Sequence, residues 1–259
     1  MSPPGGEHSA PLVRMEGIVK RFGAVEALKG VDLDLHRGEV LGLVGDNAAG
    51  KSTLMKVLTG VHQPDAGRVL FDGRPVHFRD PHDSRALGIE MIYQDLALVP
   101  SLDVVANVFL GRETVQPLLG GLIRRLDERA MEAATWDVIR RLKINMDSVR
   151  KSVSLFSGGQ QQAVAIGRAV SFNARVIIMD EPTASLAVRE VGKVLELVRE
   201  LRSRRVSVIL ISHRLQDIFA VADRVMVLYG GRGAGVVRVA DTTMDEVVRL
   251  IVGANGGTA

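Results

Sequence analysis

Residues 40–53 read VLGLVGDNAAGKST, an apolar run followed by a turn of small residues and a lysine. Residues 45–52 match the pattern G-x-x-x-x-G-K-[ST], and Leu54 to Leu58 after them predict a helix. Small residues between a buried strand and a helix let backbone N–H groups close around phosphate oxygens, and the helix dipole favours their charge. We therefore expect this loop to bind the phosphates of a nucleotide through Gly45, Asp46, Asn47, Ala48, Ala49, Gly50, Lys51, Ser52 and Thr53. A glycine-rich turn carrying a surface lysine is the alternative, and the order of strand, loop and helix argues against it.

Lys51 and Ser52 have distinct expected roles in this loop. The lysine would reach the β and γ phosphate oxygens, and the serine hydroxyl would hold Mg²⁺. A second apolar run, Val176 to Met179, ends in the carboxylate pair Asp180 and Glu181. Asp180 would hold the metal, and Glu181 would orient and polarise an attacking water. Without the phosphate loop, a solvated turn before a proline would explain the pair equally well.

Composition and length describe a globular chain of 259 residues with 46% apolar and 24% charged residues. The 33 basic and 30 acidic residues are scattered, which argues against a nucleic-acid partner. Cysteine is absent, which excludes disulfides and thiolate metal sites. No apolar run approaches the roughly 18 to 20 residues needed to span a bilayer. We expect one domain over residues 12–252, with unstructured tails at 1–11 and 253–259.

Two patterns of strand are expected around the loop. Val40 to Val44, Val176 to Met179 and Val208 to Ile211 are uninterrupted apolar runs, typical of parallel strands buried on both faces. Apolar spacing after Val188 predicts a helix, so strands and helices alternate as in an α/β fold. Three shorter, partly alternating segments predict a small antiparallel sheet with its clearest turn at Asp72-Gly73: Leu12 to Ile18, Val31 to Leu35 and Val69 to Phe78.

The middle of the chain has a different pattern. From about 95 to 172 the apolar spacing is mostly helical, and Arg124 to Lys143 alternates charged and apolar residues as a helix does. We therefore expect an inserted helical subdomain over residues 95–172.

Further motifs carry a resemblance to a known family. Residues 156–160 read FSGGQ, which resembles the signature of ABC ATPases, usually LSGGQ, through Ser157, Gly158, Gly159 and Gln160. Gln94 resembles the glutamine of the Q-loop, a further metal ligand in this family. His213, directly after a predicted strand, resembles the switch histidine, a catalytic residue beside Glu181 and Lys51. Phe22 resembles the aromatic residue that stacks on adenine.

Taken singly, each of these residues has an ordinary explanation. His213 fits a capping or core histidine, Gln94 a loop residue, Phe22 a core side chain and residues 157–159 a flexible turn. Their joint order along most of the chain favours the functional interpretation. The resemblance implies a P-loop NTPase with a RecA-like parallel sheet core, a small antiparallel β subdomain and an inserted helical subdomain.

The likeness is greatest to ATPases of importers for simple sugars such as ribose, xylose or fructose. Residues 107–113, 160–162 and 212–224 carry it. It implies ATP and Mg²⁺ as ligands, a second copy of the chain as an ATP-dependent partner, and transmembrane permease subunits that dock on residues 94–113. A solute-binding protein would be an indirect partner, and the chain would lie peripherally at the cytoplasmic face of the cell membrane. Which solute is carried is not implied.

Three residues depart from the family pattern. Ala48 stands where a third glycine is usual, so its Cβ lies near the phosphates and restricts a backbone angle. Ala187 stands where the D-loop usually has an aspartate that serves communication across the dimer. Phe156 replaces leucine, a change we expect to affect packing only.

Two other classes of function share part of this set of motifs. A soluble ABC-type ATPase acting on DNA or ribosomes would fit the motifs, but a coiled-coil insert, a second ATPase domain and a basic cluster are all missing from the sequence. A small-molecule kinase would share the phosphate loop but would have no use for residues 157–160.

Overall fold

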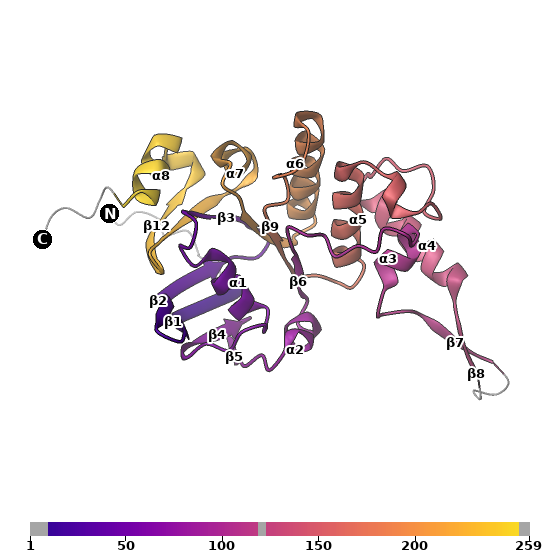
Figure 1. Ribbon diagram of the computed structural model, residues 1–259, viewed down its shortest axis with the longest axis horizontal. Helices are drawn as coiled ribbons and strands as arrows, with labels where there is room; N and C mark the ends of the chain where they lie inside the picture. The colour runs from indigo at the N-terminus through magenta and orange to yellow at the C-terminus, as the bar shows by residue number, and fades with distance from the viewer. Residues whose placement is uncertain (1–9, 119–122, 254–259) are drawn as a thin grey trace, which may run out of the picture.

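A six-stranded sheet forms the centre of the computed structural model, which describes residues 10–118 and 123–253 (Figure 1). Its order is β12-β11-β3-β10-β9-β6, and all but β12 run parallel. Its members are β3 (Val40–Gly45), β6 (Ile89–Ile92), β9 (Val176–Asp180), β10 (Ser207–Ile211), β11 (Arg224–Tyr229) and β12 (Arg232–Arg238). The three apolar runs predicted as central strands are confirmed as β3, β9 and β10.

Each face of this sheet is covered by a different layer, because successive side chains of a strand point to opposite faces. Leu41 and Leu43 of β3 belong to a core shared with α1 and the antiparallel sheet. Val40 and Val44 belong to a second core, shared with α5, α6, α7 and α8. The helices around the sheet are α1 (Lys51–Leu58), α2 (Pro81–Ala86), α6 (Val188–Ser203), α7 (Leu215–Val221) and α8 (Met244–Ile251), with a 3₁₀ turn at Val239–Asp241.

The predicted antiparallel sheet is also confirmed, in the order β2-β1-β4-β5. Its strands are β1 (Val13–Phe22), β2 (Val25–Leu35), β4 (Ala66–Phe71) and β5 (Arg74–Val76). Asp72 and Gly73 both have positive φ, 55° and 74°, as a tight two-residue hairpin turn requires.

The inserted segment contains α3 (Val104–Phe109), α4 (Glu128–Arg141), a 3₁₀ turn (Val153–Leu155) and α5 (Gly158–Val170). These helices share a third apolar core that includes Val108, Ile139, Phe156 and Val164. Figure 1 shows them together at one end of the molecule. This common core supports the boundaries 95–172, which we retain as a proposal together with the single domain over 12–252. Most of the two predicted tails, residues 1–9 and 254–259, lies outside the described residues.

One expectation for this segment is wrong. Residues 124–126 do not begin a helix, because Ile123–Leu126 forms strand β8, paired antiparallel with β7 (Val115–Leu118). The hairpin projects from the molecule (Figure 1). The helix begins at Glu128, because Asp127 is the N-cap and its carboxylate accepts a hydrogen bond from the N–H of Ala130 at 3.0 Å.

Candidate functional site

The predicted phosphate, carboxylate, glutamine and histidine residues follow four neighbouring parallel strands. The phosphate loop follows β3 and His213 follows β10. Asp180 ends β9, Glu181 follows it, and Gln94 follows β6. The sheet order β3-β10-β9-β6 places these strand ends side by side. In open α/β sheets, ligands bind outside the carboxyl ends of the strands. These sequence-predicted residues therefore gather at the carboxyl ends of the parallel strands, whereas Phe22 lies on the antiparallel sheet and residues 157–160 lie on α5.

The phosphate loop has a backbone that only small residues can follow. A Cβ added at Gly45 would lie 2.2 Å from the carbonyl oxygen of Leu228, and one at Gly50 would lie 2.9 Å from that of Ala27. Lys51 folds back over the loop, and its Nζ donates to the carbonyl oxygens of Gly45 at 2.8 Å and Asp46 at 3.0 Å. Half-burial of the ammonium lowers the pKa of Lys51, while Glu181 and Asp180 partly oppose the shift.

Ala48 adopts a φ of 64°, in the left-handed region that glycine occupies without cost. For an L-residue with a Cβ this conformation costs roughly 1–2 kcal/mol. The departure from the usual glycine therefore introduces local strain in the loop.

A cleft of about 460 Å³ lies between this loop and the antiparallel sheet. Phe22 lines it at the end of β1, with 45% of its surface exposed. Its ring packs edge-on against His62, with 5.1 Å between the centroids. The side chain is thus not a core phenylalanine. An aromatic ring beside a cradle of backbone N–H groups fits the base and phosphates of ATP.

Ser52, in the first turn of α1, is a neighbour of Asp180 at the end of β9. Burial raises the pKa of Asp180, opposed by Lys51, Lys56 and Ser52. In the described ranges no three His, Asp, Glu or Cys residues cluster as a metal site. One hydroxyl and one carboxylate still fit Mg²⁺, which takes few protein ligands and completes its shell with water and phosphate oxygens. Gln94 is exposed at the adjacent strand end.

Glu181 and His213 form a hydrogen-bonded pair, with 2.8 Å between Oε2 and Nδ1. Glu181 has a φ of 51° and donates its N–H to the carbonyl oxygen of Ile211 on β10. Burial raises the pKa of Glu181, and His213 opposes the shift by its charge and its hydrogen bonds. The histidine side chain is 66% exposed. The pair places a partly desolvated base where its charge acts on Lys51 of the phosphate loop.

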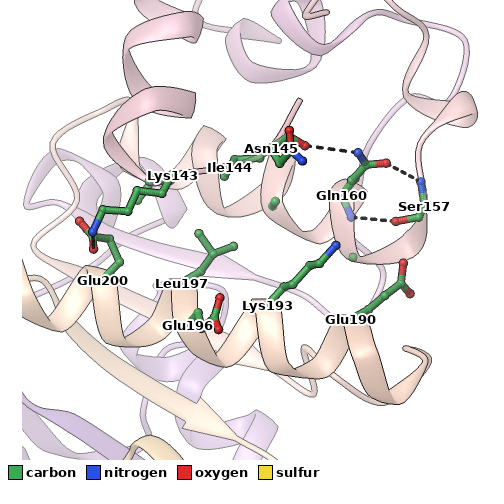
Figure 2. Close-up of a pocket in the computed structure, with 13 residues that line it drawn as sticks. Lys143, Ile144, Asn145, Ser157, Gln160, Glu190, Lys193, Glu196, Leu197 and Glu200 are labelled. Carbon is green, nitrogen blue, oxygen red and sulfur yellow. Dashed lines mark hydrogen bonds and ion pairs between the residues drawn. The ribbon is translucent and has the colours of Figure 1, made fainter. Parts of the chain in front are cut away.

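Residues 157–160 lie elsewhere, at the first turn of α5. Ser157 is the N-cap and forms a capping box with Gln160. Ser157, Gly159 and Gln160 line a second cavity of about 470 Å³ beside α6 (Figure 2). No described residue lines both this cavity and the cleft at Phe22. Phe156 is buried in the core of the helical segment, as expected of a packing residue.

Sequence reasoning missed two groups near these motifs. A Cβ added at Gly159 would lie 3.3 Å from the Cδ of Glu190, and the nearby polar groups of Ser157 and Gly159 lower the pKa of Glu190. The Thr183 hydroxyl and Asp217 Oδ2 form a buried hydrogen bond of 2.6 Å. Of these residues, only Glu190 could have been noticed in the sequence. It stands three residues after the N-cap Ala187, at the N3 position where a capping box has its acid.

Comparison with known proteins identifies similar chains. Residues 28–184 match the family described as ABC transporter. The chain is 42% identical over 246 residues to the fructose import ATP-binding protein FrcA of Rhizobium meliloti, covering 94% of this chain and 95% of that protein. It is 45% identical over 253 residues to the ribose import ATP-binding protein RbsA 2 of Streptomyces avermitilis, covering 98% of this chain but only 49% of that protein. The ADP conformation of MJ1267, an ATP-binding cassette of an ABC transporter, superposes with a TM-score of 0.81 at 29% identity over 95% of this chain and 100% of that one.

Proposed function

Because this chain belongs to the ABC transporter family, we propose that it is the ATP-hydrolysing, energy-coupling subunit of an importer for a simple sugar. Relatives that match it along nearly their whole length are named for import of fructose and of xylose or arabinose. The observation that carries the proposal is the Glu181–His213 pair at 2.8 Å, beside a phosphate loop with a lysine at its helix start.

The residues at the carboxyl ends of the strands would each have a different role in ATP hydrolysis. Lys51 would turn from the Gly45 and Asp46 carbonyls to the β and γ phosphate oxygens of ATP. Glu181 would accept a proton from the attacking water, and the hydrogen bond to His213 would hold the carboxylate in place. Mg²⁺ bound through Ser52 and Asp180, with Gln94 nearby, would neutralise charge on the phosphates.

Two copies of the chain would share each ATP. The signature residues 157–160 and the phosphate loop line separate cavities in one chain. Ser157 and Gly159 of one copy would therefore complete the site around the nucleotide held by Lys51 of the other. Charge-assisted contacts made only in the closed pair would shift the equilibrium between monomer and dimer toward the dimer.

A groove between β6, α3 and α5 suits the proposed docking of the permease. It lies against the segment 94–113 and is lined by Tyr93, Leu110 and Phe172 together with Arg85, Arg112 and Arg168. Arg112 is paired with the nearly buried Glu90 at 2.7 Å. In the described part of the chain, no helix has the length and apolarity to cross a membrane. We infer peripheral attachment at the cytoplasmic face, with a solute-binding protein as an indirect partner.

Transport assays with the cognate permease test this proposal. Liposomes that carry the chain and the permease should take up labelled ribose, xylose or fructose only when ATP is on the side of the membrane that the chain faces. Glu113→Lys, at an exposed end of the docking segment, should reduce uptake while ATP turnover of the isolated chain persists. Glu196→Lys on α6 is the matched control with the same charge change. Loss of basal turnover with intact docking, or equal loss of uptake in both variants, would contradict the proposed surface.

A further inference from the structure

A second aromatic ring, that of His62, contacts Phe22 from outside the nucleotide cleft. The two ring centroids lie 5.1 Å apart at an interplanar angle of 69°, an edge-to-face geometry that aromatic pairs favour. Phe22 lines the cleft with 45% of its surface exposed, whereas His62 is partly buried and is not among the described residues that line the cleft. His62 therefore supports Phe22 from the protein side and leaves the cleft side of its ring open.

His62 belongs to the turn that follows α1, the helix that begins with Lys51 of the phosphate loop. Gly60 turns the chain after this helix with a φ of 75°. A Cβ at position 60 would lie 2.6 Å from the carbonyl oxygen of Asp80, so only glycine fits there. The His62 N–H then donates to the carbonyl oxygen of Lys56 at 3.0 Å. The turn thus fixes His62 to the end of α1.

Asp65, at the end of this turn, ties it to the strand that carries Phe22. Its carboxylate accepts the Arg21 N–H at 2.5 Å and pairs with the Lys20 ammonium at 3.0 Å. Its own N–H donates to the carbonyl oxygen of Val19 at 2.8 Å. The Lys20 ammonium also lies 5.7 Å from the centroid of the Phe22 ring, within the range of a cation–π contact. The turn and the end of β1 therefore form one connected unit.

These contacts hold the Phe22 ring in place before a nucleotide binds. Phe22 is the last residue of β1, and its partner across the hairpin turn is Val25, which is 66% exposed. Without a ring packed against it, an aromatic side chain this exposed would populate several rotamers. Ordering such a side chain on binding costs affinity, and a side chain that is ordered in advance avoids that cost.

We propose that His62 is a positioning residue for the base of the nucleotide, which acts by holding the Phe22 ring in the orientation that stacks on the base. This role rests on the proposed binding of ATP in the cleft at Phe22. One helix would then serve both ends of the ligand, because the N-terminus of α1 faces the phosphates and the turn after its C-terminus supports the aromatic ring. His62 itself would not touch the nucleotide, so its effect would be exerted through Phe22.

The test compares a ligand that has a base with one that has none. ADP and inorganic pyrophosphate both carry phosphates for the loop at Lys51, but only ADP has a base. Neither has the γ-phosphate through which two copies would pair, so both report on the single chain. Isothermal titration calorimetry of the full chain with Mg²⁺ gives the two dissociation constants. We expect His62→Ala to raise the constant for ADP by about two- to tenfold and to leave the constant for pyrophosphate unchanged.

Two further variants serve as controls. His62→Phe keeps a ring at this position and should retain the affinity for ADP. His77→Ala removes an exposed histidine that is not among the described residues lining the cleft, and neither constant should change.

A double-mutant cycle with Phe22 separates positioning from a general disturbance of the turn. Phe22→Ala alone should raise the ADP constant by about fivefold or more, because it removes the stacking surface. Adding His62→Ala to Phe22→Ala should then have no further effect, since the ring that His62 positions is gone. A disturbed turn would instead weaken binding in both backgrounds.

The outcomes distinguish this role from the proposed function. A loss of ADP affinity in His62→Ala that is absent for pyrophosphate and absent without Phe22 supports the role. An unchanged ADP constant, an equal loss for pyrophosphate, or the same loss in the Phe22→Ala background overturns it, while nucleotide binding at the loop stands. A chain that binds neither ADP nor pyrophosphate overturns both. If His62→Ala folds poorly, His62→Asn takes its place, and an ADP constant equal to that of His62→Phe overturns the role.

Discussion

The start of α6 lacks a side-chain cap, and adding one should stabilise the chain. Ala187 occupies the N-cap position with φ −65° and ψ 152°, the extended conformation of a capping residue, but offers no side-chain acceptor. Glu190 stands at N3, where a capping box carries its acid. Ala187→Ser would supply the other half by accepting the N–H of Arg189 or Glu190. Serine, unlike the aspartate usual in the family, adds no charge beside Glu190.

The expected gain is about 1 kcal/mol in the free energy of unfolding, the typical difference between serine and alanine at an N-cap. For a chain of this size the gain corresponds to a rise of roughly 2 to 4 °C in melting temperature. Thermal unfolding followed by circular dichroism measures it. Val188→Ser is the matched control, because position 188 is 83% exposed. A serine hydroxyl there follows the N-cap and cannot cap the helix. A melting temperature no higher for Ala187→Ser than for Val188→Ser would refute the capping argument.

Three further predictions concern the nucleotide site. Lys51→Ala should abolish ATP turnover, because no neighbour supplies its charge to the β and γ oxygens; unchanged turnover in a steady-state assay would remove the loop assignment. Ala48→Gly should lower the ATP dissociation constant by up to about tenfold by removing the methyl group from the phosphate-binding loop, and an unchanged or higher constant would count against this explanation. Since the base acts when ionised and burial raises the pKa of Glu181, kcat/KM should fall with decreasing pH through that raised pKa. His213→Ala removes the opposing interaction, so the acidic limb of the pH profile should move to higher pH; a shift to lower pH would disprove the coupling.

The features that could be predicted from the sequence are formed by residues that are contiguous in the chain. The phosphate loop could be predicted because the strand, the loop and the helix are contiguous in residues 40–58. The strands β3, β9 and β10 could be predicted because burial on both faces makes them continuous apolar runs. The turn at Asp72-Gly73 could be predicted because that pair accepts positive φ.

Other features depend on contacts between distant residues. The β7–β8 hairpin was mistaken for the beginning of a helix because the adjacent Arg124 and Arg125 carry no alternating apolar signal. The close approach of Glu190 to Gly159 joins α6 to the first turn of α5 and depends on how the two helices pack. The strained φ of Glu181 likewise arises from its N–H bond to Ile211 on the neighbouring strand. No spacing rule in the sequence identifies these contacts.

ATP-dependent pairing of two copies is the central claim, and Glu181→Gln tests it most directly. The variant keeps the shape of the site but loses the base, a step worth typically ~10² to 10⁴-fold in rate. It should therefore retain ATP and accumulate as a closed pair, with His213→Ala showing a similar but smaller effect. Multi-angle light scattering of the full chain with and without ATP and Mg²⁺ measures the mass. The mass of 28.0 kDa should double only when ATP and Mg²⁺ are present, whereas a monomer under both conditions would contradict ATP-dependent pairing.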